Sequence, residues 1–264
     1  MAFSLDSVSK GKVQRAPRII LLGVEKIGKS TFAAGANNPI FLPIKGEEGI
    51  DGLDVAKFPT ARQYGEVIEA LGSLYNEDHN YGAVVVDSAS TLEPLVWDET
   101  RLQNGNAESI EKVGGGYGKG YIEALKYWRE IMDGLDALRE HKNMASVLIG
   151  HVTKRDEEDP VAGTYRTFDF DVHKRAQSAL FRWADCILFA NTKTLIRTEE
   201  AGFNKTTKRG VGTDERRLYT QKRPAHPGGG RDVYGRIPYE LPLDWSAFQQ
   251  AVADASNTAP QVAA

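Results

Sequence analysis

The residues with the clearest chemistry form one short stretch, Gly23-Val24-Glu25-Lys26-Ile27-Gly28-Lys29-Ser30-Thr31. This stretch matches the phosphate-binding pattern G-x-x-x-x-G-K-[ST] at every defined position. In that pattern the backbone N–H groups of the loop surround a phosphate, the lysine reaches the outer phosphates and the hydroxyl contacts Mg2+. We therefore expect all nine residues to bind a nucleotide, with Lys29 on the phosphates and Ser30 on the metal.

A second candidate metal ligand is Asp87, which ends the apolar run Ala83-Val84-Val85-Val86. In proteins with a phosphate-binding loop, an aspartate at the end of a buried strand commonly binds Mg2+. An apolar run that ends in an acid is frequent in any protein, so this signal gains its meaning from the loop about 60 residues upstream. The pair predicts a magnesium-dependent nucleotide site.

Glu47, Glu48 and His151 also follow strand-like runs. Phosphoryl transfer needs a group that orients the attacking water, and a carboxylate after a neighbouring strand suits that task, so Glu47 or Glu48 is the candidate. His151 is a candidate contact for the terminal phosphate. The alternatives remain open, since paired acids are common on surfaces and a histidine can simply end a strand.

Apolar runs alternate with amphipathic segments along the chain, as in a mainly parallel sheet with helices on both faces. The strand-like runs start at Arg18, Pro39, Tyr81, Ala145 and Asp185, and residues 192–197 and 217–221 resemble the strands of a C-terminal β-hairpin. Residues 104–120 and 152–170 are predicted to be loops. We expect a flexible arm over residues 1–16, one domain over 17–253 and a disordered tail over 254–264.

Charge is distributed unevenly along the 264 residues. The formal net charge is −3, yet residues 191–236 contain eleven Lys and Arg against five acids, which makes that segment +6 and the remainder −9. A local basic segment suggests contact with a polyanion, although a solvated charged hairpin explains it nearly as well. Cys186 is the only cysteine, which excludes an intrachain disulfide, and no apolar run reaches membrane-spanning length, so we expect a cytoplasmic protein without a membrane partner.

The order of these landmarks resembles that of the RecA-like P-loop ATPases. It is most similar to phage-encoded members described as nucleotide-binding proteins or single-strand annealing recombinases. The matching pieces are GVEKIGKST at 23–31, GEEGIDGLDV at 46–55, AVVVDSASTLEP at 83–94, LIGHVTKR at 148–155, HKRAQSALFRWADCILFAN at 173–191, RRLYT at 216–220 and RIPYELPLDW at 236–245.

This resemblance implies an ATPase that uses ATP and Mg2+, with Glu47, Lys29 and His151 as catalytic residues and Ser30 and Asp87 on the metal. It also implies self-assembly into a ring or filament and action on single-stranded DNA. The two predicted loops correspond to DNA-contacting loops of the family and contain the candidate residues Lys112, Tyr117, Lys119, Lys154, Arg155, Arg166 and Phe168. Arg231 is the candidate for reaching the nucleotide of a neighbouring subunit.

Three other functions compete with this interpretation. Thr153-Lys154-Arg155-Asp156 mimics the guanine-reading pattern [NT]-K-x-D of GTPase switches, but the segment after Asp87 lacks the glycine of D-x-x-G. A nucleotide kinase would use the basic segment as a lid over a second phosphate substrate. An ATP-binding assembly factor would need the loop but little hydrolysis.

Overall fold

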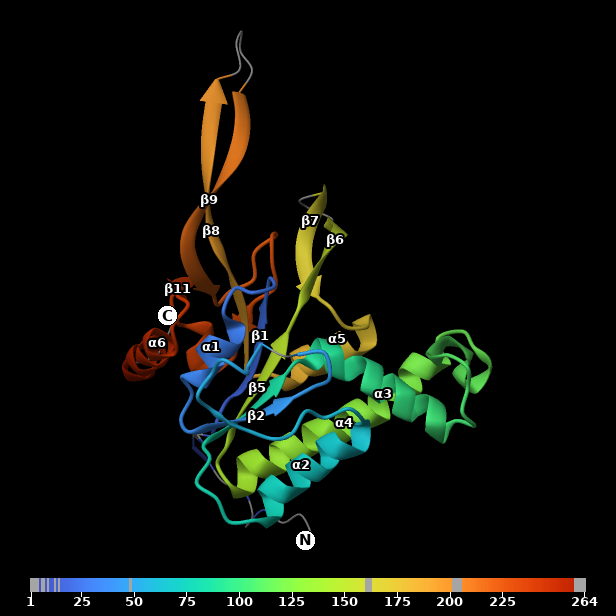
Figure 1. The fold of residues 1–264 in the computed structure, drawn as a ribbon. Helices are drawn as coiled ribbons and strands as arrows, with labels where there is room; N and C mark the ends of the chain where they lie inside the picture. The colour runs from blue at the N-terminus through green and yellow to red at the C-terminus, as the bar shows by residue number, and fades with distance from the viewer. Residues whose placement is uncertain are drawn as a thin grey trace.

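A mainly parallel sheet runs through the middle of the protein in the computed structural model (Figure 1). The model describes residues 5, 8, 10, 11, 13, 15–47, 49–159, 163–200 and 206–258, and for 195–200 and 206–212 the backbone alone. Within these residues the sheet has nine strands, with the order β11-β9-β8-β1-β5-β4-β2-β3 and β10 beside β8. The parallel strands are β1 (Arg18–Gly23), β2 (Pro39–Pro43), β3 (Ala56–Lys57), β4 (Ala83–Asp87), β5 (Ala145–Gly150) and β8 (Cys186–Glu200). The antiparallel strands are β9 (Thr206–Tyr219), β10 (Gly229–Gly230) and β11 (Glu240–Pro242).

Both faces of this sheet are covered by helices, because successive side chains of each buried strand point to opposite faces. Ile20 and Leu22 of β1 pack with α2 (Tyr64–Asn76), α3 (Ala89–Gln103), α4 (Lys119–His141) and α5 (Lys174–Trp183). Ile19 and Leu21 pack on the other face with α1 (Lys29–Ala34) and α6 (Trp245–Asn257). The predicted fold class, a mainly parallel α/β sheet with helices on both faces and a C-terminal β-hairpin, is confirmed.

The strand order brings the predicted site residues to one edge of the sheet. Strand β5 lies between β1 and β4, and β2 lies beyond β4. Leu22 is opposite Gly150 and Pro43 is opposite Asp87, so the carboxyl ends of these strands are level with one another. The loops that follow them therefore meet at a common edge, which is where ligands bind in sheets of this kind.

Two β-hairpins project from this edge (Figure 1). One is formed by β8 and β9, so the predicted hairpin strand at 192–197 is the continuation of a core strand. The other is formed by β6 (Val152–Asp159) and β7 (Gly163–Phe170), and the prediction of a loop over 152–170 was wrong. Strand β7 is rich in β-formers, among them Tyr165, Thr167 and Phe168, and pairing with β6 satisfies the backbone groups that a loop would leave to water.

Two further predictions need correction. Residues 110–115, labelled η2, form 3-10 turns with a kink at Val113 and Gly114, and Ile110 and Val113 are buried in the core, so the glycine-rich segment is anchored. Helix α6 continues to Asn257 with Ala255 buried, so the predicted tail cannot begin at residue 254. In the predicted N-terminal arm, Arg15 already pairs with Glu140 of α4 at 3.0 Å.

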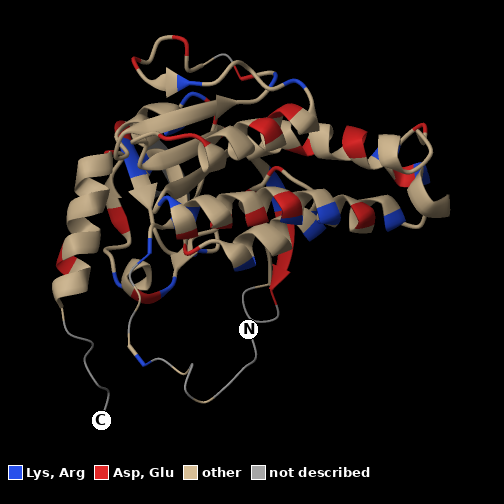
Figure 2. Ribbon diagram, turned by 90° about the horizontal axis from the view of Figure 1, so that it is seen from below, with Lys and Arg blue, Asp and Glu red and all other residues tan. Residues whose placement is uncertain are grey.

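Several helices carry both acidic and basic residues, whereas α6, which leads to the C-terminus, has no Lys or Arg (Figure 2). A short 3-10 turn, η3 (Asp232–Gly235), lies between β10 and β11. None of the helices in the described ranges is both long and apolar enough to cross a membrane.

Candidate nucleotide-binding site

The loop between β1 and α1 has the shape of a phosphate cradle. Gly28 has φ of 106°, a left-handed conformation that glycine adopts readily, and it precedes the first residue of α1. Gly23 lies so close to β8 that an added Cβ would be 2.6 Å from the carbonyl oxygen of Ala190. Backbone conformation therefore requires a glycine at position 28, and close packing requires a glycine at position 23.

Lys29 lies inside this loop and is 6% exposed. Its Nζ donates to the carbonyl oxygens of Gly23 at 2.9 Å and Val24 at 3.0 Å, and no carboxylate within the described residues pairs with it. Burial lowers the pKa of Lys29, while the nearby charges of Asp87 and Glu47 act in the opposite direction. A buried ammonium group bonded only to carbonyl oxygens leaves a place for an anionic ligand such as phosphate.

Ser30 and Asp87 meet directly beside the loop. The Ser30 hydroxyl donates to Oδ2 of Asp87 at 2.6 Å, and Asp87 is 3% exposed. Burial raises the pKa of Asp87, the hydrogen bond from Ser30 lowers it, and the negative charge of Glu47 raises it further. One hydroxyl and one carboxylate beside a phosphate cradle form the oxygen donor set that fits Mg2+, which takes its remaining ligands from phosphate and water.

Glu47 is held toward the same spot by two side chains. Ser88 Oγ donates to Oε1 of Glu47 at 2.8 Å, and Nε2 of His151 lies 2.6 Å from the same oxygen. Burial raises the pKa of Glu47, but the hydrogen bonds from His151 and Ser88 outweigh it and leave the pKa below its usual range. The carboxylate is therefore ionised at neutral pH, as a group that accepts a proton from water must be.

His151 is fixed at the end of β5 through its backbone as well as its ring. Its N–H donates to Ser90 Oγ at 3.0 Å, and its Nδ1 is buried with no hydrogen-bond partner among the described residues. In a neutral ring that donates from Nε2 to Glu47, Nδ1 carries the free lone pair. Contact of His151 with a terminal phosphate stays a prediction.

These contacts bring together loops from β1, β2, β4 and β5 around one anion-binding cradle. A family model described as an AAA domain matches residues 15–231, which include every residue named above. The chain belongs to the AAA domain family. No curated protein matches it closely enough to be reported as a relative. The crystal structure of the RadB recombinase is similar over 78% of this chain and 81% of that one, with 16% identity and a TM-score of 0.43.

Two serines of this AAA domain were not assigned a role from the sequence. Ser88 contacts Glu47 and also accepts from the N–H of Thr91 at the start of α3, while Ser90 contacts the backbone of His151. Both serines follow Asp87 at the junction between β4 and α3, and this position is the sequence feature that could have indicated a role in the site. Glu48, the other candidate for activating water, lies outside the described residues.

The predicted DNA-contacting residues of the AAA domain lie in two separate regions (Figure 1). Around η2, Lys112 pairs with Glu108, Lys119 starts α4, and Tyr117 is 99% exposed. The β6–β7 hairpin contains the other four, which are largely engaged within the protein. Lys154 lies over the ring of Phe168, Arg155 pairs with Asp169 at 3.3 Å, and Arg166 pairs with Asp156 at 3.6 Å.

The hairpin also contains the sequence that mimics a guanine-reading motif. Thr153 to Asp156 lie within β6 and pair with residues 166–169 of β7. Phe168 packs against Phe189 with ring centroids 5.4 Å apart, and its N–H donates to the carbonyl oxygen of Ala225. This segment is therefore a paired strand rather than a loop wrapped around a base.

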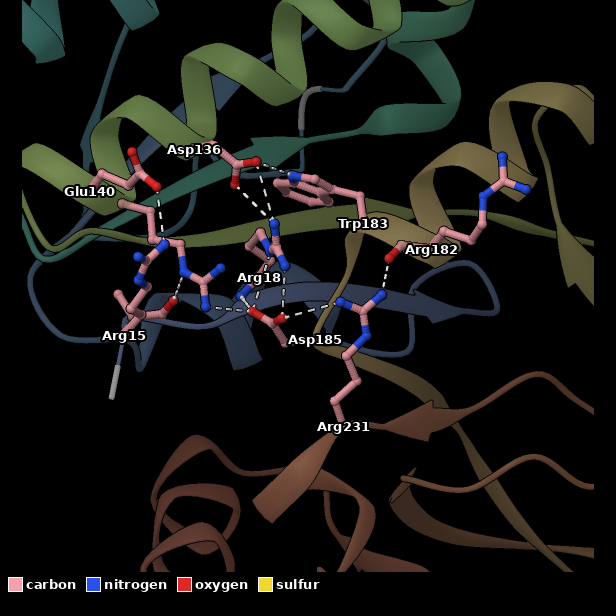
Figure 3. Close-up of polar contacts among 10 residues, drawn as sticks. Arg15, Arg18, Asp136, Glu140, Arg182, Trp183, Asp185 and Arg231 are labelled. Carbon is pink, nitrogen blue, oxygen red and sulfur yellow. Dashed lines mark hydrogen bonds and ion pairs between the residues drawn. The ribbon is translucent and has the colours of Figure 1, made fainter. Parts of the chain in front are cut away.

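Arg231 lies at the opposite, amino-terminal edge of the sheet (Figure 3). It points toward Asp185, with Nη1 4.0 Å from Oδ1, and its Nη2 donates to the carbonyl oxygen of Arg182. Asp185 also accepts from Arg18 at 2.9 Å and pairs with Arg139 at 3.0 Å. The role of Arg231 at a neighbouring subunit's nucleotide stays a prediction, and it would require Arg231 to leave these contacts.

Proposed function

We propose that the protein binds ATP with Mg2+ and hydrolyses it. The observation that carries this proposal is the position of the Glu47 carboxylate, which Ser88 and His151 hold ionised beside Lys29, Ser30 and Asp87. A phosphate cradle alone would support binding only. A fixed and ionised carboxylate next to the cradle supplies the group that hydrolysis needs to orient water.

Each side chain has a distinct task in this proposal. Lys29 exchanges its carbonyl contacts for phosphate oxygens, and Ser30 and Asp87 would hold Mg2+, which neutralises charge on the phosphates when bound. Glu47 orients the attacking water and accepts its proton. His151 positions Glu47 through Nε2, so it acts through another residue unless its ring also contacts phosphate.

Steady-state ATP hydrolysis tests this proposal. Glu47→Gln removes the proton acceptor but keeps the size of the side chain, so turnover falls by about a hundredfold or more while ATP binding persists. The adjacent Glu48→Gln is the matched control and keeps turnover within about threefold. Lys29→Ala loses binding. Equal losses in both glutamine variants, or turnover by Glu47→Gln at the wild-type rate, would refute the assignment of Glu47.

We further propose that this ATPase acts on single-stranded DNA, in phage recombination or annealing, as a ring or filament of subunits. Tyr117 supports a DNA contact because its ring is 99% exposed within a glycine-rich turn and Lys112 and Lys119 flank it. Exposed aromatic rings stack on bases of any identity, and lysines bind the backbone. The η2 region supports this contact better than the β6–β7 hairpin, because Tyr117 is exposed whereas Phe168, the candidate aromatic residue of the hairpin, packs against Phe189.

DNA binding is tested by fluorescence anisotropy of a labelled single strand over a range of salt concentrations. Tyr117→Ala weakens binding by about tenfold, as expected for one lost stacking contact. The control Tyr75→Ala removes another exposed tyrosine, on α2, and leaves binding unchanged. Sedimentation with and without ATP reports on assembly. Binding that is absent at every salt and ATP concentration would exclude DNA as the partner.

A further inference from the structure

Arg216 of β9 lies beside the phosphate-binding loop. Its Nη1 is 3.3 Å from the position that a Cβ on Gly28 would occupy, so the guanidinium group covers the loop immediately before Lys29. The sequence placed Arg216 within a basic segment and within the matching piece RRLYT, but it did not assign Arg216 a role. Its proximity to Gly28 arises because β9 pairs with β8, and β8 pairs with β1.

The register explains why Arg216 reaches the loop. Gly23, the last residue of β1, is opposite Ala190 of β8, and Arg216 is opposite Thr192, two residues further along β8. Arg216 therefore lies past the carboxyl end of β1, at the level of the loop that follows Gly23. The backbone of Arg216 is tied to the chain after β11, since its carbonyl oxygen accepts from Leu243 at 3.3 Å.

The charge of Arg216 is uncompensated within the described residues. Its side chain is exposed and forms no hydrogen bond or ion pair with any of them. Its neighbour Arg217 differs, because it contacts Glu215 at 3.2 Å and Glu240 at 3.3 Å. Arg216, which lies beside the phosphate-binding loop, is therefore available for an anionic ligand, whereas Arg217 already pairs with glutamates.

The position of Arg216 also indicates which part of a nucleotide it meets. In the sheet order, β9 and β8 lie on one side of β1, whereas β4, which ends at Asp87, and β2, which precedes the loop with Glu47, lie on the other. The terminal phosphate has to lie on the side of Glu47, where hydrolysis occurs. In the proposed hydrolysis site, the phosphate chain would then run across the loop, with its α-phosphate toward β8 and β9.

We infer that Arg216 binds the α-phosphate of the nucleotide from within the same subunit. This inference rests on the proposed nucleotide site. A guanidinium group suits the contact because its N–H groups donate to phosphate oxygens in charge-assisted hydrogen bonds. Because ATP and ADP share the α-phosphate, Arg216 contributes equally to binding of both and does not act on the bond that breaks.

Titration of the Mg2+ complexes of ATP and ADP into the full-length protein tests the inference. Arg216→Ala raises both dissociation constants by about tenfold, as expected for a lost charge-assisted hydrogen bond. In hydrolysis assays the KM for ATP rises while kcat stays within about twofold. The matched control Arg217→Ala changes neither dissociation constant by more than about twofold, because Arg217 faces the glutamates. Equal urea midpoints for Arg216→Ala and wild type verify folding.

Two results would overturn the inference. Unchanged affinity for both nucleotides would remove Arg216 from the site, and a loss confined to ATP, with a fall in kcat, would place it at the terminal phosphate. Lys29→Ala separates this failure from that of the proposed function. If Lys29→Ala still binds ATP, the nucleotide site itself is wrong. If Lys29→Ala loses binding and Arg216→Ala does not, only the role of Arg216 is wrong.

Discussion

Glu93 offers a quantitative test of how burial changes the pKa of an acid and, through it, the stability of this protein. It lies in α3 at 5% exposure, and both of its carboxylate oxygens accept from the backbone N–H of His173, at 2.8 and 2.9 Å. Burial raises the pKa of Glu93 from 4.5 to about 7, although the bond from His173 and the charge of Arg155 lower it. The carboxylate therefore joins α3 to the start of α5 at an electrostatic cost.

The sign of the effect follows from proton linkage. Because the folded state binds the proton more tightly than the unfolded chain, Glu93 reduces stability as pH rises from about 4.5 through about 7. Above pH 8 the cost is complete. A change from 4.5 to about 7, at about 1.4 kcal/mol for each pKa unit, corresponds to roughly 3 kcal/mol.

Glu93→Gln removes this cost and retains one acceptor for the N–H of His173. We expect the variant to be more stable than wild type by about 1–3 kcal/mol at pH 8.5, the lower figures arising because an amide accepts a weaker bond than a carboxylate. At pH 4.5 the difference should disappear or change sign. Urea unfolding of both proteins from pH 4.5 to 8.5 measures it.

The quantity to compare is the difference in free energy of unfolding between Glu93→Gln and wild type, because the contributions of all other titrating groups cancel in it. Glu99→Gln, the same change at another acid of α3, is the matched control for the loss of one acidic side chain from the helix. A difference between Glu93→Gln and wild type that stays constant over this pH range would refute the argument, because it would show that Glu93 ionises normally in the folded protein.

Three other predictions follow from the same contacts. Asp185→Asn leaves Arg18 and Arg139 without their shared carboxylate, so thermal unfolding should show a loss of about 3–5 kcal/mol, whereas Arg15→Ala at a half-exposed ion pair costs less than about 1 kcal/mol. Gly23→Ala forces β1 and β8 apart and costs about 1–3 kcal/mol in urea unfolding, while Gly72→Ala, with open space around its Cβ, gives no loss. His151→Ala removes a hydrogen bond that lowers the pKa of Glu47, while the burial that raises this pKa remains. The acid limb of the kcat–pH profile should therefore move to higher pH. An unchanged acid limb would show that His151 does not lower the pKa of Glu47.

Much of the geometry of the candidate site was predictable because its signals are local. The loop at Gly23 to Thr31 needs particular residues at fixed spacing, and the apolar run before Asp87 identifies a buried strand without any knowledge of its neighbours. Parallel strands end at the same edge, so Glu47 and His151 could be expected near the loop. Their hydrogen bond could not, since it depends on side-chain directions set by the packing of two loops.

Other parts of the prediction failed where pairing between distant segments decides the structure. The polar composition of residues 152–170 indicated a loop, yet β6 and β7 satisfy each other's backbone groups and form a hairpin. The sequence alone determined the fold class, the phosphate-binding loop and the candidate metal ligands. Only the tertiary structure placed Arg216 against Gly28 and Arg231 against Asp185, because the order and register of the strands, rather than the residue types, determine which arginine meets which anion.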